Sequence, residues 1–331
     1  MNLTLGGFLS RPDVKATASA TGLRYNDVTL GDVSLKAALG PDGRLSVDQL
    51  SLLNGDGHIT GSGYIDLFTS GFNLNEKGTL SAEMAFTQCR PEAFYGKVPV
   101  KGLMEGAISL SGSMTDPLGD IALSGNQLAY GENPIGDMTV TAHYGHGEGT
   151  LHRLALRNGA SQLTLSGRAR FLDTDTRTLV ANPDVRLRVD ESTIFLADFK
   201  KELQGKMRIS GILEGNVNNP TGTLEIQGES LNLNVQQINR FALRVGLANQ
   251  MLKVSDCTIH LDEDHPIMAA GTLSLSPDFP FELAVHAIDL PLSVVGPISH
   301  TDLSGNVSVT VSGKGSIKAP ALKASAIHQK F

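Results

Sequence analysis

Four copies of one short pattern constrain this chain more than any other feature. In each copy a glycine lies five residues before a proline, and an apolar residue lies three before it. The copies are Gly7/Leu9/Pro12, Gly112/Met114/Pro117, Gly215/Val217/Pro220 and Gly315/Ile317/Pro320. Their prolines are 105, 103 and 100 residues apart, and the first three copies reach a leucine eleven residues after the proline. A fixed period of this kind indicates a repeat architecture.

The second copy shows what one repeat contains. Ile108, Leu110 and Gly112 alternate with serines, which is the period-two pattern of a strand with one apolar face. Pro117 cannot donate to a β ladder, so we predict that the strand ends or becomes an edge there. Apolar residues alternate again from Ile121 onward. The pattern therefore predicts strand, turn and strand.

The same strands recur in phase in the next repeat. The apolar positions of residues 33–39 correspond to those of residues 138–144 at an offset of 105. Turns rich in glycine and asparagine separate the strands, at residues 40–43, 54–57, 145–149 and 158–159, and turns of this chemistry predict hairpins. We therefore expect one continuous array over residues 1–331, with repeats at 3–93, 94–195 and 196–298 and a partial repeat at 302–331.

Composition favours an open sheet over a closed core. Aromatic residues make up 5% of the chain, tryptophan is absent, and 36 residues are glycine, whereas a closed sandwich needs large side chains from two facing sheets. Long sheets twist and must curl. We predict an all-β fold: an elongated, repetitive antiparallel sheet of roughly 25 to 30 strands, curled into an open U-shaped groove, with few or no helices. Residues 190–200 fit either a short helix or a bulged loop.

The apolar phase of these strands predicts which side chains line the groove. They are Val33, Leu35, Leu45, Val47, Ile108, Leu110, Val140, Leu154, Leu156, Leu163, Leu165, Leu243 and Val245. The alternative is that they form the ordinary core of a closed β sandwich or solenoid.

Charge and motifs exclude several classes of function. The net charge of −7 is dispersed and basic runs are absent, so we expect no nucleic-acid partner. The acidic residues are scattered, and nucleophile elbows, P-loops and dinucleotide fingerprints are missing, so we expect no enzyme and no cofactor. Cys89 and Cys257 have no CxxC partner and fit small residues in strands.

Two polar stretches resemble metal ligands. His143, His146, Glu148 and His152 flank a glycine-rich turn, and residues 262–264 are Asp-Glu-Asp. Zinc needs converging ligands on a rigid frame, and calcium loops need spaced oxygens with a turn glycine. We interpret both stretches as solvated turns.

Hydropathy and the start of the chain bear on location. No segment approaches the roughly 20 apolar residues of a membrane-spanning helix, and residue 1 leads directly into a strand pattern without signal-peptide features. We expect any anchor or export signal to lie outside this chain, and the chain to be a piece of a longer protein.

The repeats resemble those of the TamB and AsmA-like family. The resemblance rests on the glycine-proline pattern and on segments such as LSVDQLSLLNGDGHITGSGYIDL and LHRLALRNGASQLTLSGRARF, and it covers almost the whole chain. Members are periplasmic proteins of diderm bacteria anchored in the inner membrane. Their repeats form a long β groove with a hydrophobic interior that carries phospholipid between the inner and outer membranes.

The resemblance implies a function and partners. It implies that phospholipid acyl chains occupy the groove, and that an Omp85-type outer-membrane barrel is a partner through regions absent from this chain. It also links the chain to outer-membrane protein assembly. The competing hypothesis is a structural or adhesive β-repeat protein with a closed core and no lipid cargo.

Overall fold

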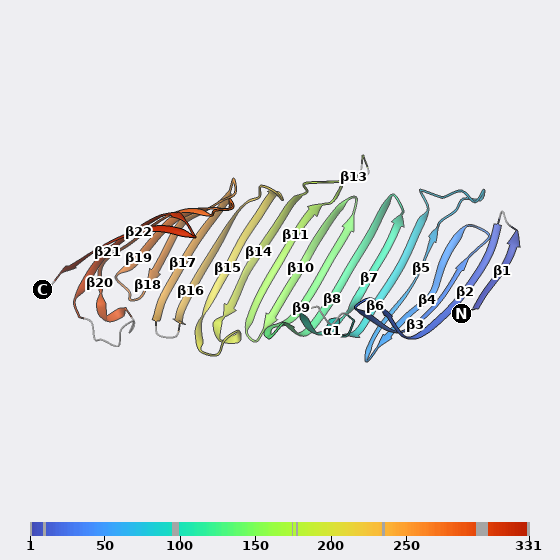
Figure 1. Cartoon of the computed structure of the whole chain (residues 1–331), viewed down its shortest axis with the longest axis horizontal. Coiled ribbons are helices and arrows are strands. Elements are labelled where there is room, and N and C mark those ends of the chain that lie inside the picture. Colours follow the sequence, from blue (N-terminus) through green and yellow to red (C-terminus); the bar gives the residue numbers. More distant parts are fainter. Residues whose placement is uncertain are drawn as a thin grey trace. The chain divides into compact units, whose positions relative to one another are not determined.

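The alternating sequence forms one long antiparallel sheet. In a computed structural model, twenty strands belong to this sheet, and β12 (Leu172–Asp173) and β13 (Thr178–Leu179) form a separate ribbon (Figure 1). The structure describes residues 2–8, 11–94, 99–173, 175–176, 178–233, 236–295 and 304–329. Within these residues β1 pairs only with β2, and β22 only with β21, so the sheet is not closed. The all-β prediction is confirmed.

The chain divides into two units. The first comprises Met1–Arg157 and Gly167–Ala181, and the second Asn158–Ser166 and Asn182–Phe331. In the first unit each strand from β1 to β10 pairs with the next: β1 (Asn2–Phe8), β2 (Arg11–Tyr25), β3 (Val28–Leu39), β4 (Arg44–Asn54), β5 (Gly57–Asp66), β6 (Thr79–Cys89), β7 (Val100–Ser113), β8 (Asp116–Tyr130), β9 (Asn133–Gly145) and β10 (Glu148–Asn158).

The second unit repeats this meander. After β11 (Ser161–Arg170), its strands are β14 (Asp184–Phe195), β15 (Leu203–Asn216), β16 (Thr221–Leu233), β17 (Gln236–Ala248), β18 (Met251–His260), β19 (Pro266–Ser274), β20 (Pro280–Pro291), β21 (Asn306–Ser316) and β22 (Ala319–Gln329). The described chain holds 22 strands, so the expected 25 to 30 is wrong. Individual strands reach 15 residues, and such long strands leave room for fewer of them.

Glycine and proline of the repeated pattern face each other across a hairpin. Gly7 pairs with Pro12, Gly112 with Pro117 and Gly315 with Pro320. In the third copy, Gly215 and Pro220 lie one position closer to the turn than the pair Glu214 and Thr221. They therefore occupy the equivalent place in their hairpin. Six strands separate successive hairpins: β2–β7, then β8–β11 with β14 and β15, then β16–β21. The four copies are therefore structurally equivalent; Leu9 and the expected repeat boundary at 298–302 lie outside the described residues.

The geometry of this hairpin explains both residues. Asn219 N donates to Asn216 O at 2.9 Å and closes the third copy's two-residue turn, so the next pair outward is not hydrogen-bonded and tolerates proline. The glycines have φ between 78° and 120°, and a Cβ on Gly112 would lie 2.7 Å from Asp116 O. β7 ends at Ser113 and β8 begins at Asp116, so the predicted strand, turn and strand is confirmed. Pro117 lies at the start of the second strand rather than at the end of the first.

In the first three copies, the leucine that follows the proline lies in a β-bulge. The residue before it has a left-handed backbone: Gly22, Gln127 and Ser230 have φ of 60°, 52° and 51°. Leu128 and Leu231 then pack over two glycines each and are only 4% and 5% exposed. Leu23, their counterpart in β2, is 39% exposed. These bulges supply part of a very small buried core.

A short helical turn follows the fifth strand of each repeat: α1 (Pro91–Phe94), η1 (Leu196–Asp198) and η2 (Leu292–Val294). Asn54 Nδ2 donates to Ala93 O at 3.0 Å, and Asn158 Nδ2 donates to Asp198 O at 3.1 Å, so the predicted Asn-Gly turns hold these segments. Residues 190–200 contain both expected alternatives, because β14 has a register shift before Ser192 and η1 follows.

Leu128→Ala should lower the free energy of unfolding by about 2–4 kcal/mol, because it leaves a cavity over two glycines. Leu23→Ala should cost less than about 1 kcal/mol, because its counterpart is largely exposed. Urea unfolding monitored by circular dichroism measures both. Equal losses would contradict the role given to the buried bulge leucine.

Candidate functional site

One face of the first unit is uniformly apolar. Residues paired across an antiparallel ladder share a face, so the register traces this face from strand to strand. One row contains Leu35, Leu50, Gly61, Met84, Ile108, Ile121, Ala142 and Leu151. Neighbouring rows on the same face contain the other predicted residues of this unit: Val47 and Leu110 share one row, Val33, Val140 and Leu154 share another, and Leu45 and Leu156 lie in two further rows. These rows hold no charged residue, and they bring nine of the thirteen predicted lining residues onto one surface.

The second unit has an equivalent face. Leu243 pairs with Ile226 and Cys257, and Val245 with Leu224 and Val254, so the two predicted residues share it. The row continues through Gly271, Leu283, Gly313 and Leu322. In β11, Gln162 donates to Thr164 at 3.4 Å, which places these two side chains together and leaves Leu163 and Leu165 on the opposite side of that strand.

Bulges keep the apolar residues on this face where simple alternation fails. In the third strand of each repeat, two polar residues separate two apolar ones, at 47–50, 151–154 and 254–257. The register shifts at each of these points, so Val47 and Leu50 both remain on the apolar face. Sequence reasoning missed these bulges, although the apolar-polar-polar-apolar string was a usable signal.

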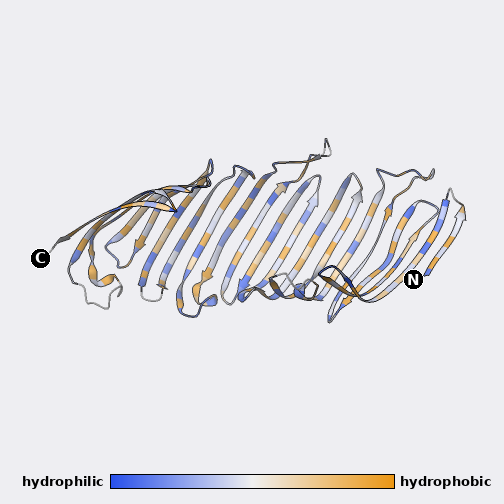
Figure 2. Ribbon diagram, in the orientation of Figure 1, coloured by the Kyte–Doolittle hydropathy of each residue, from blue (hydrophilic) through white to orange (hydrophobic). Residues whose placement is uncertain are grey.

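The apolar face is mostly uncovered in each unit. Among the described residues, only Cys89, Leu128, Leu231, Ala287 and Leu290 are buried apolar side chains. Leu110 and Leu283, from the middle of the face in their units, are 39% and 38% exposed. The face is hollowed in both units, by about 430 Å³ near Gly63 and about 560 Å³ near Gly271. Figure 2 shows the underlying alternation of hydrophobic and hydrophilic residues along the strands.

The opposite face is polar and carries ion pairs between register partners. Lys206 Nζ lies 2.9 Å from Glu229 Oε2, and Arg244 lies 2.9 Å from Glu225. Lysine donation lowers the pKa of the Glu229 carboxyl. Such exposed pairs contribute little stability each, but they mark this face as the solvated one.

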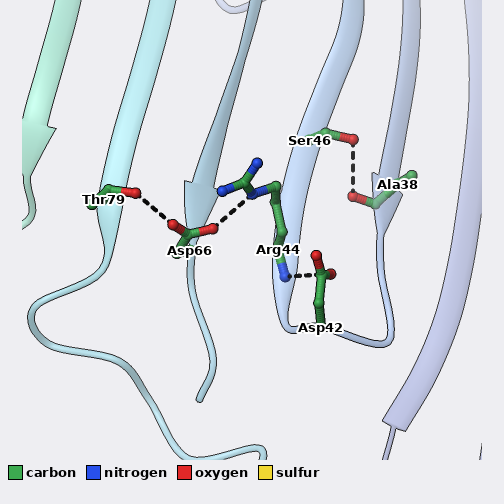
Figure 3. Close-up of polar contacts among 6 residues, drawn as sticks. All are labelled: Ala38, Asp42, Arg44, Ser46, Asp66 and Thr79. Carbon is green, nitrogen blue, oxygen red and sulfur yellow. Dashed lines mark hydrogen bonds and ion pairs between the residues drawn. The ribbon is translucent and has the colours of Figure 1, made fainter. Parts of the chain in front are cut away.

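A similar network lies at one end of β4, β5 and β6 (Figure 3). Arg44 Nε donates to Asp66 Oδ1 at 2.7 Å, and Thr79 also donates to this carboxylate. The hydrogen bond from Arg44, followed by that from Thr79, lowers the pKa of Asp66. Arg44 also stacks on Tyr64, with Cζ 4.1 Å from the ring centroid. These contacts join three strands on the polar side.

The metal-like stretches form local pairs. His143 Nδ1 lies 2.8 Å from Asp120, and His146 Nδ1 lies 2.9 Å from Asp116. His152 lies at a register shift in β10. In the part of the chain that is described, no three or more His, Cys, Asp or Glu residues gather as metal ligands.

The acidic turn at residues 262–265 is closed by its own hydrogen bonds. Asp262 Oδ1 accepts from the backbone N–H of Asp264 and His265, and Asp262 Oδ2 lies 2.8 Å from His265 Nδ1. The hydrogen bond to Asp262 raises the pKa of His265. Burial alone would raise the pKa of Asp262, but hydrogen bonds from His265 outweigh it and lower that pKa.

Cys89 and Cys257 are free thiols. They lie in β6 and β18, where the sequence analysis interpreted them as small residues in strands. Burial raises the pKa of both, so neither thiol is activated. Among the residues that the structure describes, no helix is both long and apolar enough to cross a membrane.

Comparison with protein-family models finds no match, and comparison with curated proteins or with solved structures finds none either.

The His265 pair should make stability depend on pH. A raised histidine pKa stabilises the fold below the ordinary value of 6.5, and this contribution disappears as pH rises through the folded pKa. The lowered pKa of Asp262 contributes above the ordinary 3.8 and is lost as pH falls through the folded pKa. The stability difference between the parent chain and His265→Asn should therefore be largest between these values. Parallel pH profiles in chemical unfolding would contradict this assignment.

Proposed function

We propose that the apolar face binds phospholipid acyl chains and that this chain is a segment of a periplasmic hydrophobic conduit between the inner and outer membranes. One observation carries the proposal. The paired residues traced above form an apolar face without a charged residue in each unit, and much of it is exposed. Soluble proteins rarely expose large contiguous apolar patches unless something binds there.

The chemistry of the face suits hydrocarbon. An acyl chain needs apolar area and no hydrogen-bond partners, and it gains free energy in proportion to the area removed from water. The polar face beneath keeps its charges in solvent and pairs them there. A sheet with these two faces, curled into an open U-shaped groove, would screen acyl chains from water and leave a headgroup outside. That curl is part of the proposal.

The cellular setting follows from the resemblance of the repeats to the TamB and AsmA-like family. In this proposal the parent protein is anchored in the inner membrane, and an Omp85-type outer-membrane barrel contacts regions outside this chain. The segment described here forms part of the conduit, and it contributes to outer-membrane biogenesis by that route.

The competing function is a structural or adhesive β-repeat protein with a closed core. That function requires a second layer over the apolar face. Among the described residues each strand packs against its neighbours in the sheet, and of the short turns α1 lies beside β3 and β7 and η1 beside β15. This packing favours the open conduit over a β-repeat protein with a closed core.

Leu110→Arg should reduce phospholipid binding several-fold and leave the chain folded, because a charge can be hydrated on an open face but not in a closed core. Leu110 is already 39% exposed. The matched control is Ser111→Arg, on the polar face of the same strand, which should bind lipid like the parent.

Lipid binding is measured by photo-crosslinking to phospholipid, with circular dichroism as the test of folding. Equal labelling of the two variants would argue against acyl chains on this face. Unfolding of Leu110→Arg alone would favour the closed core.

A further inference from the structure

The two hollows of the apolar face lie at matching places in the first and third repeats. Both lie over the third, fourth and fifth strands of their repeat, counted from the glycine-proline hairpin. Residues of β7 also line the first hollow, and residues of β17, β22 and the last hairpin also line the second. The register makes their lining residues equivalent: Leu45 with Leu252, Val47 with Val254, Gly63 with Gly271, Ile65 with Leu273, Leu80 with Phe281 and Ala82 with Leu283. Because each hollow lies within one unit, the two are independent occurrences of the same feature.

A glycine forms the floor of each hollow for the same reason. A Cβ on Gly63 would lie 2.5 Å from Ser81 O, and a Cβ on Gly271 would lie 2.5 Å from Glu282 O. Neither position can carry a side chain without moving the neighbouring strand, since real Cβ atoms do not approach a carbonyl so closely. The close approach of the fourth and fifth strands therefore keeps the floor empty of side chains.

The walls of the hollows select an occupant without polar groups. Leu45, Ile65 and Leu80 surround the first floor, and Leu252, Leu273 and Phe281 the second. Glu83 and Glu282 border the hollows, but they pair with Ser62 and Thr272 on the polar face of their strands. An apolar cavity holds water poorly. Volumes of about 430 and 560 Å³ fall in the range of ligand pockets, which bind small molecules rather than whole protein surfaces.

We propose that acyl chains rest at discrete stations on this face, one over Gly63 and one over Gly271, rather than on a uniform strip. This inference rests on the proposed function and adds to it. Each station is the hollow over strands three to five of its repeat. The occupant is a single hydrocarbon chain, so fatty acids and phospholipids share the station.

The test uses a palmitate analogue with a photoreactive diazirine, incubated with the intact chain and mapped by mass spectrometry of crosslinked peptides. Labelling should concentrate in β4–β6 and in β18–β20. Ala82→Phe fills the first hollow and should lower labelling of β4–β6 at least five-fold while labelling of β18–β20 is retained. Val254→Phe should show the reverse.

The matched control is Ala85→Phe, whose side chain lies on the polar face of β6 and should change neither site. Circular dichroism and urea unfolding of each variant report whether both units remain folded, so filling of a hollow is distinguishable from local unfolding. Labelling spread evenly over the apolar face, or unchanged by both filling variants, would overturn the stations and leave the conduit standing. Absence of labelling in the parent chain would overturn both proposals. Labelling that disappears as a dimer forms with rising protein concentration would assign the hollows to a second copy of the chain.

Discussion

Everything in this molecule depends on keeping apolar residues on one side of a very long antiparallel ladder. A one-residue slip in register would turn a strand's apolar set to the solvated face. The alternation of apolar and polar residues nevertheless breaks in several strands, and a β-bulge at each break returns the next apolar residue to the apolar face. Val47 and Leu50, for example, are separated by two residues yet share a face. The bulges also provide the few buried side chains, such as Leu128 and Leu231. The same device therefore maintains the face and supplies its core.

Glycine works with the bulges at three kinds of position. At the repeated hairpin it supplies a left-handed backbone opposite proline, as at Gly112. Under Leu128, Gly102 and Gly125 leave room for the buried side chain. At Gly63 the neighbouring strand approaches too closely for any side chain, and the face is hollowed there. Large aromatic residues are scarce because a single-layer sheet has little interior to fill.

The sequence predicted the strands, the repeat and most of the apolar face, because period-two alternation and glycine turns are local signals. The register aligns three of the predicted lining residues, Leu35, Ile108 and Val245, with apolar partners on neighbouring strands. The sequence analysis overestimated the number of strands, since nothing local sets strand length, and it took Pro117 as an end where the register makes it a beginning. The hollows over Gly63 and Gly271 could not be predicted, because they depend on how closely two strands approach.

The central claim is that the apolar face takes up hydrocarbon from phospholipid. The most direct measurement is to purify the chain without detergent from cells, and to analyse it intact by native mass spectrometry. The account predicts mass additions that correspond to phospholipid and disappear after extraction with organic solvent. A folded chain that carries no lipid, and takes none up from phospholipid vesicles, would contradict it.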